Sequence, residues 1–238
     1  MSDTASESGK IGLTRLQIAW RAAQDIADGS YVNLGIGMPM TIPRFLPEGR
    51  EIMLHSESGL LGMGPPPAKG EEDWDLINAG TRPTTVLPGG SFFHHADSFA
   101  IVRGGHLDIS VLGAFQISEK GDLANWSLGP SAARVPTVGG AMDLAAGAKQ
   151  VYVLTDHCSR DGSPKIVSEC DLPLTGLACV NRIYTDLAVI EVTGAGLAVR
   201  EIIDGLAFAD LEAKTGAPIR PGEDCKTLTA PAIDEAGV

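Results

Sequence analysis

Residues 31–39 of the chain read YVNLGIGMP, a short run of strand-forming residues that passes directly into two glycines, Gly35 and Gly37. Similar apolar or β-rich runs occur at residues 51–55, 84–87, 109–113, 150–155 and 187–192. Stretches with helical character separate several of them, at residues 14–28, 41–46, 91–102 and 140–147. This alternation of strand and helix predicts an α/β fold with a mostly parallel open sheet and flanking helices.

The two ends of the chain differ from its middle. Thr14 and Gln17 form a capping-box pair at the start of the first predicted helix, and Gly29 is its expected stop. A second helical spacing runs from residue 199 to residue 215. We expect flexible tails at residues 1–11 and 220–238, and a single domain at residues 12–219 because no linker interrupts it.

Composition narrows the possible functions. The chain has 238 residues, of which 44% are hydrophobic and 20% charged, as in soluble globular proteins. A net charge of −12 opposes binding to nucleic acids and anionic membranes. The four cysteines form neither a C-x-x-C pair nor a zinc pattern with the five histidines, so we expect no metal. The sequence shows neither a signal peptide nor a long apolar run, which predicts a cytoplasmic protein.

Glycine is abundant, with 29 residues, and it clusters just after predicted strands. The clusters are Gly35/Gly37, Gly59/Gly62/Gly64, Gly89/Gly90, Gly104/Gly105 and Gly139/Gly140. Ligands of parallel α/β sheets bind beyond the carboxyl ends of the strands, where glycine allows the backbone to approach them closely. The clusters therefore predict a ligand crevice lined by backbone, although each cluster alone also fits an ordinary turn.

The strongest candidate for chemistry lies in residues 52–65, IMLHSESGLLGMGP. An apolar strand runs directly into Glu57, which a glycine-rich turn follows. At such a strand end a carboxylate is partly desolvated, which raises its pKa and makes its ionised form more reactive. A solvated loop glutamate is the commoner situation, but the apolar and glycine residues on both sides of Glu57 favour a buried, reactive carboxylate.

Other motifs allow several interpretations. Gly35 and Gly37 suggest a dinucleotide site, but Met40 stands where the third glycine is needed. His94 and His95 suggest metal binding or acid–base chemistry, but neighbouring helical residues point about 100° apart. Helix-start packing and hydrogen bonding to substrate are therefore favoured for these two histidines.

Two further segments complete the candidates. Gly139 and Gly140 open a predicted helix with free backbone N–H groups, which suits an oxyanion or a phosphate as well as a plain helix entry. Asp156, His157 and Cys158 look like a reactive Cys–His pair only superficially, because adjacent side chains diverge.

A series of segments resembles the B subunit of 3-oxoacid CoA-transferases. They are residues 33–39 (NLGIGMP), 56–65 (SESGLLGMGP), 75–80 (DLINAG), 96–100 with 103–106 (ADSFA and RGGH), 121–126 (GDLANW), 139–144 (GGAMDL) and 184–189 (YTDLAV). The resemblance runs in order from about residue 12 to residue 219. Within the family, residues 93–97 (FHHAD) are most similar to the 3-oxoadipate:succinyl-CoA transferase branch.

The resemblance implies the CoA-transferase (NagB/RpiA-like) fold and transfer of CoA from succinyl-CoA to a 3-oxo acid, with 3-oxoadipate favoured and acetoacetate next. Glu57 would carry CoA as a covalent thioester. The reaction would need no cofactor besides its substrates, CoA and succinyl-CoA. A partner chain, the A subunit of the CoA-transferase, would complete the site at their interface, in a heterodimer or heterotetramer.

Further roles follow from the same resemblance. Gly139 and Gly140 are the expected oxyanion or CoA contacts, and Asn33 is expected to hydrogen-bond the acid substrate. Ser58 stands where the family signature has Asn beside the catalytic glutamate, and we expect it near the substrate. Two rival interpretations are a thioester hydrolase or sugar-phosphate isomerase of the same fold, and a non-catalytic partner that only binds CoA or scaffolds another chain.

Overall fold

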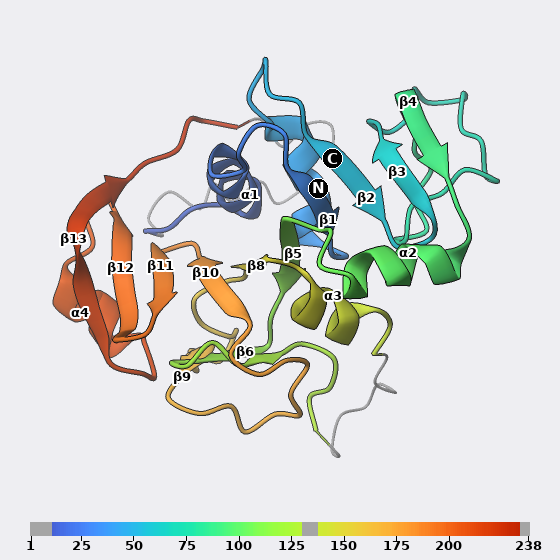
Figure 1. The fold of residues 1–238 in the computed structure, drawn as a ribbon. Coiled ribbons are helices and arrows are strands. Elements are labelled where there is room, and N and C mark those ends of the chain that lie inside the picture. The colour runs from blue at the N-terminus through green and yellow to red at the C-terminus, as the bar shows by residue number, and fades with distance from the viewer. Residues whose placement is uncertain (1–10, 130–137, 234–238) are drawn as a thin grey trace, which may run out of the picture.

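The computed structural model describes residues 11–129 and 138–233. Its helices are α1 (Arg15–Gln24), α2 (His95–Arg103), α3 (Ala141–Gly147) and α4 (Phe208–Ala213), with a 3-10 helix, η1, at Met38–Phe45 (Figure 1). Its strands are β1 (Tyr31–Leu34), β2 (Met53–Ser56), β3 (Leu60–Met63), β4 (Val86–Phe92), β5 (Ile109–Gly113), β6 (Gln116–Ser118), β7 (Leu123–Ala124), β8 (Gln150–Leu154), β9 (Ile166–Val167), β10 (Val180–Tyr184), β11 (Ala188–Thr193), β12 (Gly196–Ile203) and β13 (Ile219–Leu228).

The main sheet has ten strands in the order β13-β12-β11-β10-β8-β5-β1-β2-β3-β4, and β7, β6 and β9 form a second, small sheet. The centre, from β10 through β8, β5 and β1 to β2, is parallel. Antiparallel pairs flank it on both sides, and β13 pairs in parallel with β12. The carboxyl ends of the five central strands therefore lie along one edge, as expected for an α/β ligand site.

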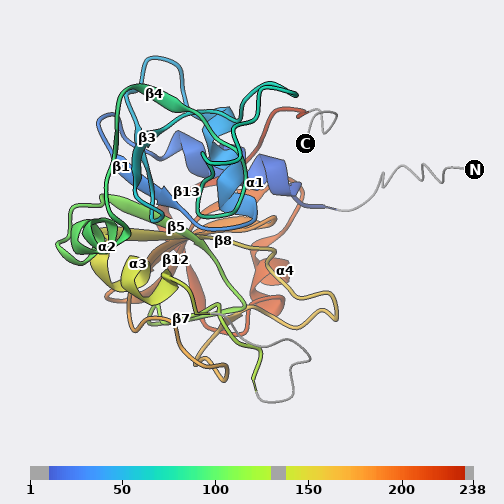
Figure 2. The same ribbon diagram turned by 90° about the vertical axis from the view of Figure 1, so that its right-hand side faces the viewer.

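Helices cover both faces of this sheet. Figure 2 shows α1 on one side of β5 and β8, and α2 with α3 on the other. Successive residues of β5 enter different cores: Val111 belongs to the core that includes Ile18 of α1, whereas Leu112 belongs to the core that includes Val102 of α2. Both cores consist mostly of buried aliphatic side chains, which makes hydrophobic burial the main stabilisation of the three layers.

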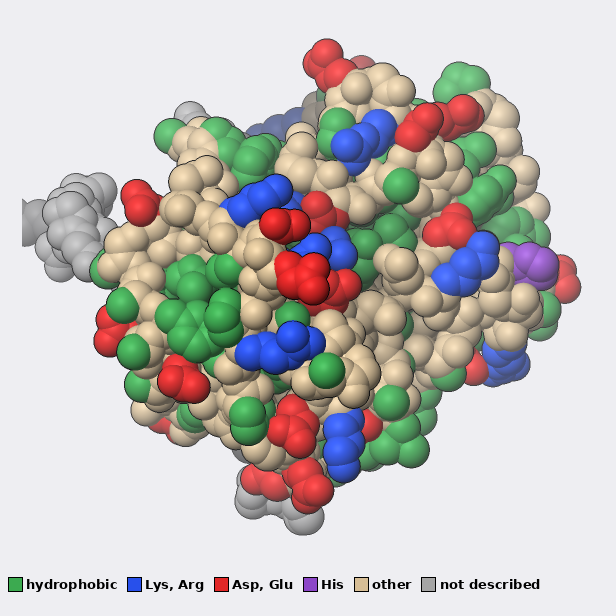
Figure 3. Space-filling view, turned by 60° about the vertical axis from the view of Figure 1, so that its left-hand side comes forward, with side chains coloured by type: hydrophobic (Ala, Val, Ile, Leu, Met, Phe, Trp, Pro, Cys, Tyr) green, Lys and Arg blue, Asp and Glu red, His purple; other side chains and the backbone are tan. Residues whose placement is uncertain are grey.

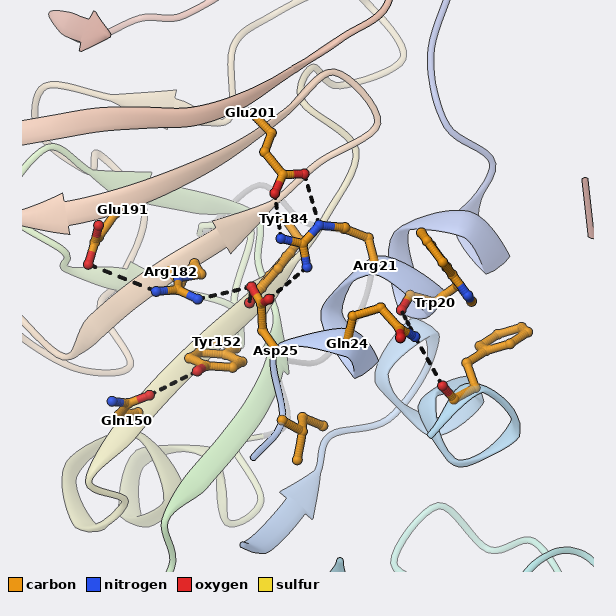
Figure 4. Close-up of polar contacts among 12 residues, drawn as sticks. Trp20, Arg21, Gln24, Asp25, Gln150, Tyr152, Arg182, Tyr184, Glu191 and Glu201 are labelled. Atoms are coloured by element: carbon orange, nitrogen blue, oxygen red, sulfur yellow. Dashed lines mark hydrogen bonds and ion pairs between the residues drawn. The ribbon is translucent and has the colours of Figure 1, made fainter. Parts of the chain in front are cut away.

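An ion-pair network ties α1 to the far half of the sheet (Figure 4). Asp25, at the end of α1, accepts hydrogen bonds from Arg21, from Arg182 and from the Tyr184 hydroxyl. Arg21 also donates two hydrogen bonds to Glu201 of β12. Burial alone would raise the pKa of Asp25, but the hydrogen bonds and charges of its partners outweigh burial and lower it.

The sequence predicted the first helix only in part. Its capping box between Thr14 and Gln17 is confirmed. The helix ends at Gln24, however, with Asp25 as its C-cap, so the prediction that it continues to Asp28 and stops at Gly29 is wrong. The polar contacts of Asp25 with β10 replace a further helical turn.

The largest error concerns the carboxyl-terminal part. The predicted helix over residues 199–215 is wrong, because the structure has β12 there, followed by the short helix α4. The predicted tail beginning at residue 220 is also wrong as far as residue 228, because β13 pairs in register with β12. As an edge strand β13 is exposed at most positions, so its composition resembles that of a tail.

The surface matches the acidic composition. On the face drawn in Figure 3, Lys and Arg side chains lie among Asp and Glu side chains, which fits the low affinity for polyanions expected from the net charge. In residues 11–129 and 138–233, none of the helices is long and apolar enough to cross a membrane.

Candidate active site

Glu57 occupies the tip of the hairpin between β2 and β3. The Gly59 amide donates to the carbonyl of Ser56 at 3.0 Å and closes the turn around it. Gly59 has φ of +115°, and a Cβ there would lie 2.2 Å from the Phe93 carbonyl oxygen, so the turn requires glycine. The glutamate is thus carried on a rigid turn packed against the end of β4.

A cavity of about 610 Å³ lies beside this turn, at the carboxyl ends of β1, β5 and β8. Its lining includes Glu57, Gly35, Gly113 and Thr155. Gly139 and Gly140 line it as well, as the glycine clusters predicted. The clusters Gly59/Gly62/Gly64, Gly89/Gly90 and Gly104/Gly105 are not part of this lining, and their prediction as ligand-facing backbone is wrong for this cavity.

The start of α3 lies against the glutamate. A Cβ on Gly140 would lie 3.2 Å from Oε1 of Glu57 and 2.8 Å from Cζ of Phe99. Only glycine allows such an approach without displacing one of these side chains. Gly139, with φ of +54°, precedes it in the lining.

The Glu57 carboxyl group is half-buried, and its electrostatics follow from this position. Burial raises its pKa above the ordinary value of 4.5. A hydrogen bond from the Asn33 side chain and the charge of His95 oppose the rise only in part. The ionised carboxylate is therefore a stronger base and nucleophile than a solvated glutamate.

A row of buried polar side chains, made of Asn33, His55 and Ser98, lies next to the glutamate. Asn33 on β1 and His55 on β2 are paired in register, and both are 1% exposed. Asn33 Nδ2 lies 3.1 Å from His55 Nδ1, and His55 Nε2 lies 3.0 Å from Oγ of Ser98 on α2. The sequence pointed to Asn33, but it missed His55 and Ser98, since nothing local marks their convergence.

Ser58 lies in the same turn but is exposed and does not belong to the cavity lining. Its hydroxyl is 2.9 Å from that of Ser56, which accepts a hydrogen bond from the Ala79 amide. The contacts of Ser58 are thus with the turn that carries Glu57.

The two histidines after β4 have separate roles. His94 is the N-cap of α2, and its Nδ1 accepts from the Ala96 amide at 3.1 Å, which confirms helix-start packing. His95 packs edge-on against Phe99, with ring centroids 5.0 Å apart, and acts on Glu57 through its charge.

His157 belongs to the core. It is completely buried between the hydroxyl groups of Thr185 and Thr215, each 3.0 Å from a ring nitrogen. The thiol of Cys158 instead faces the Lys214 carbonyl, so the two do not form a catalytic pair. The described residues contain no cluster of three or more His, Cys, Asp or Glu side chains that could hold a metal ion.

The cavity also has a charged portion that the sequence did not reveal. Arg15, Asp156 and Lys165 line it together with Glu57. Arg15 pairs with Asp156 at 2.8 Å, and Lys165 Nζ donates to Oγ1 of Thr155 at 2.9 Å. Burial lowers the pKa of Lys165. These residues come from separate loops and helices, and no motif connects them in sequence.

Comparison with known proteins gives one consistent result. The family model described as Coenzyme A transferase matches residues 15–213. The chain is 61% identical over 207 residues to the B subunit of 3-oxoadipate CoA-transferase from Acinetobacter baylyi, covering 87% of this chain and 95% of that one. It is 46% identical over 203 residues to the B subunit of a probable succinyl-CoA:3-ketoacid coenzyme A transferase from Bacillus subtilis, covering 85% and 93%.

Solved structures show the same fold. The crystal structure of glutaconate coenzyme A-transferase from Acidaminococcus fermentans superposes with a TM-score of 0.68 at 17% identity, over 93% of this chain and 91% of that one. Three findings point to the same family. They are the mixed sheet, the position of Glu57 at the carboxyl edge of that sheet, and the family-model match over residues 15–213. The chain belongs to the coenzyme A transferase family, as an enzyme of the B-subunit type.

Proposed function

We propose that this chain moves CoA from succinyl-CoA to a 3-oxo acid, with 3-oxoadipate favoured and acetoacetate next, through a thioester on Glu57. The observation that carries the proposal is the half-buried Glu57 carboxylate in the cavity wall, directly against the glycine start of α3. The relative with 61% identity is named a 3-oxoadipate CoA-transferase, which supports this choice of acceptor.

The reaction proceeds by two exchanges at one carboxylate. A Glu57 oxygen attacks the succinyl-CoA carbonyl, the C–S bond breaks, and a mixed anhydride and CoA thiolate form. The thiolate attacks the glutamyl carbonyl, succinate leaves, and CoA remains on Glu57 as a thioester. The 3-oxo acid then attacks this thioester, and the same steps in reverse yield 3-oxoacyl-CoA and free Glu57.

The surrounding residues support these steps in distinct ways. The Gly139 and Gly140 amides donate hydrogen bonds to the oxyanion of each tetrahedral intermediate. Asn33 orients the attacking carboxylate, which it reaches through its amide hydrogen. Phe99, packed beside Gly140, helps to keep water from the anhydride. Ser58 acts through its bond to Ser56, by fixing the turn that presents Glu57.

A partner, the A subunit of the CoA-transferase, completes the site in this proposal. Both relatives are named as B subunits, which supports a heteromeric enzyme. Large apolar side chains are exposed beside the site: Ile36, in the cavity lining, is 74% exposed, and Phe92, paired with Leu60 of the Glu57 hairpin, is 68% exposed. Burial of these side chains against the partner, in a heterotetramer, would remove apolar surface that monomers rarely expose. We place the enzyme in the cytoplasm, where its four free thiols would stay reduced.

The proposal is tested by trapping the thioester. The chain is co-expressed with its A-type partner, incubated with succinyl-CoA, reduced with borohydride and analysed by intact mass and peptide mapping. Reduction of a glutamyl thioester to an alcohol leaves a small mass loss on the peptide that contains Glu57. Glu57→Gln, which keeps the shape of the side chain, must show neither the mass loss nor CoA exchange. A folded complex that binds CoA but is never modified would instead favour a purely binding role.

A further inference from the structure

The hydrogen bonds that connect Asn33, His55 and Ser98 run in one direction. Asn33 Nδ2 lies 3.1 Å from His55 Nδ1 and 3.3 Å from the His55 carbonyl oxygen. A carbonyl oxygen can only accept a hydrogen bond, so the nitrogen of the Asn33 amide faces His55. His55 Nδ1 must then be the acceptor of the remaining contact, and the imidazole carries its proton on Nε2.

The Ser98 hydroxyl accepts a hydrogen bond from this Nε2–H group. It lies 3.0 Å from His55 Nε2, is completely buried, and comes from α2 on the same face of the sheet. The His55 ring also stacks on Phe93, with centroids 6.1 Å apart, but a phenyl ring offers no partner to a ring nitrogen. Within the described residues, the Ser98 hydroxyl is thus the hydrogen-bond partner of Nε2–H and holds the imidazole ring in place.

The oxygen atom of the Asn33 amide does not help to fix the orientation of this amide. Asn33 Oδ1 is buried and has no hydrogen-bond donor among the described residues. The orientation of this amide therefore depends on the contacts of its nitrogen with His55. The Asn33 side chain also lowers the pKa of the Glu57 carboxyl group, as a donor beside that carboxylate does.

We propose that His55 and Ser98 are positioning residues for the catalytic glutamate: Ser98 accepts from Nε2–H and anchors the imidazole, and His55 Nδ1 holds the Asn33 amide nitrogen in place beside Glu57. This inference rests on the proposed function of Glu57. If the proton moved to Nδ1, two N–H groups would face each other, and the amide would have to turn its oxygen toward the carboxylate. That arrangement repels the anion and removes a charge-assisted hydrogen bond.

The test compares Ser98→Ala with Ser110→Ala. Ser110 on β5 is in register with Asn33 on its other side, is equally buried, and has no hydrogen-bond partner in the described part of the chain. Both variants thus remove one hydroxyl from the same row. We expect Ser98→Ala to slow single-turnover thioester formation in the two-chain complex by about tenfold, at unchanged KM for succinyl-CoA.

A second pair of variants separates chemistry from packing. His55→Asn keeps an acceptor near the Nδ1 position, whereas His55→Leu removes it at similar volume. We expect His55→Asn to retain a thioester-formation rate several-fold above that of His55→Leu. The acid limb of the pH profile should move upward in Ser98→Ala and His55→Leu, since the Glu57 carboxylate loses a donor. His95, the other titratable group acting on Glu57, is the same in all four variants.

Different experimental outcomes would refute this inference and the proposed function. Equal rates and pH profiles for Ser98→Ala and Ser110→Ala would overturn the inference, as would equal losses in both His55 variants. Thermal unfolding identifies any variant that fails to fold, in which case the His55 pair alone decides. A wild-type complex that forms no thioester would refute the proposed function itself, before any variant is compared.

Discussion

Gly140 and Glu57 lie so close that a single added carbon at position 140 would press against the carboxylate. A Cβ at position 140 would be 3.2 Å from Glu57 Oε1 and 2.8–2.9 Å from two ring atoms of Phe99. The start of α3 and the β2–β3 hairpin are 83 residues apart in sequence. Because the fold brings them into contact, position 140 requires glycine.

Gly140→Ala should therefore damage catalysis more than folding. The added carbon would displace both the Phe99 ring and the Glu57 carboxylate, and misplacement of the reacting carboxylate is expected to cost about 10- to 100-fold in rate. Single-turnover thioester formation with succinyl-CoA measures the effect. Gly113→Ala is the control, because Gly113 lines the same cavity and a Cβ there would meet no described atom within 4 Å. Equal rates for both variants would contradict close contact at Gly140.

The charge of His95 should set the acid limb of the reaction. Glu57 must be ionised to attack, so thioester formation declines as the pH falls through its pKa, which burial raises above 4.5. The charge of His95 lowers this pKa, so His95→Asn should raise it and move the acid limb toward higher pH. The single-turnover rate, recorded from about pH 4 to pH 8, measures the shift relative to the unshifted Glu range.

Titration of the succinyl-CoA carboxylate would affect wild type and variant alike, and so cancels in this comparison. His94→Asn is the matched control, since His94 is the neighbouring histidine but uses its ring nitrogen to cap α2. An acid limb that moves downward, or moves equally in both variants, would show that His95 does not act through its charge.

The central strands β1, β5 and β8 were the most predictable part of the fold, whereas β10, which pairs with β8, was not predicted. β1 and β5 have the predicted limits, and β8 is one residue shorter, because strands buried on both faces read as continuous apolar runs. The edges were not predictable in this way. The apolar residues of β12 imitate helical spacing, and β3 lies hidden in the glycine-rich run that follows Glu57.

The residues of the site differ in predictability in the same way as the strands do. Glu57 and its glycine turn are contiguous, so their sequence alone predicted a desolvated carboxylate at a strand end. Asn33, His55 and Ser98 come together only through strand register and the packing of α2, neither of which a local pattern encodes. Arg15 and Lys165 reach the cavity from positions 150 residues apart, which also requires the complete fold.

Leu228 should stabilise the fold from a segment that the sequence predicted to be a tail. It ends β13, is completely buried, and packs in the core beneath α1. Leu228→Ala should cost about 2–5 kcal/mol in free energy of unfolding, the usual range for a buried leucine. Urea denaturation of the chain measures it. Thr227→Ala, at the exposed neighbouring position, should change stability by less than about 0.5 kcal/mol. A Leu228 variant as stable as wild type would show that β13 contributes little to the fold.

The Asp25 network should make stability depend on acid pH. Asp25→Asn keeps the size of the side chain but removes the charge shared by Arg21 and Arg182, whose side chains are only 15% and 28% exposed. Leaving these guanidinium groups underpaired should cost about 3 kcal/mol, the lower end for a buried pair.

The sign of the pH effect follows from the lowered pKa of Asp25. Its contribution is present above the unfolded-state pKa and is lost as the pH falls through the lower folded-state value. The stability gap between wild type and Asp25→Asn should therefore be largest near neutral pH and close in acid, as urea titrations at several pH values would show. Lys149→Ala, which breaks the exposed pair with Asp108, should cost less than about 1 kcal/mol. A gap that stays constant with pH would mean that the network stabilises α1 through shape rather than through the Asp25 charge.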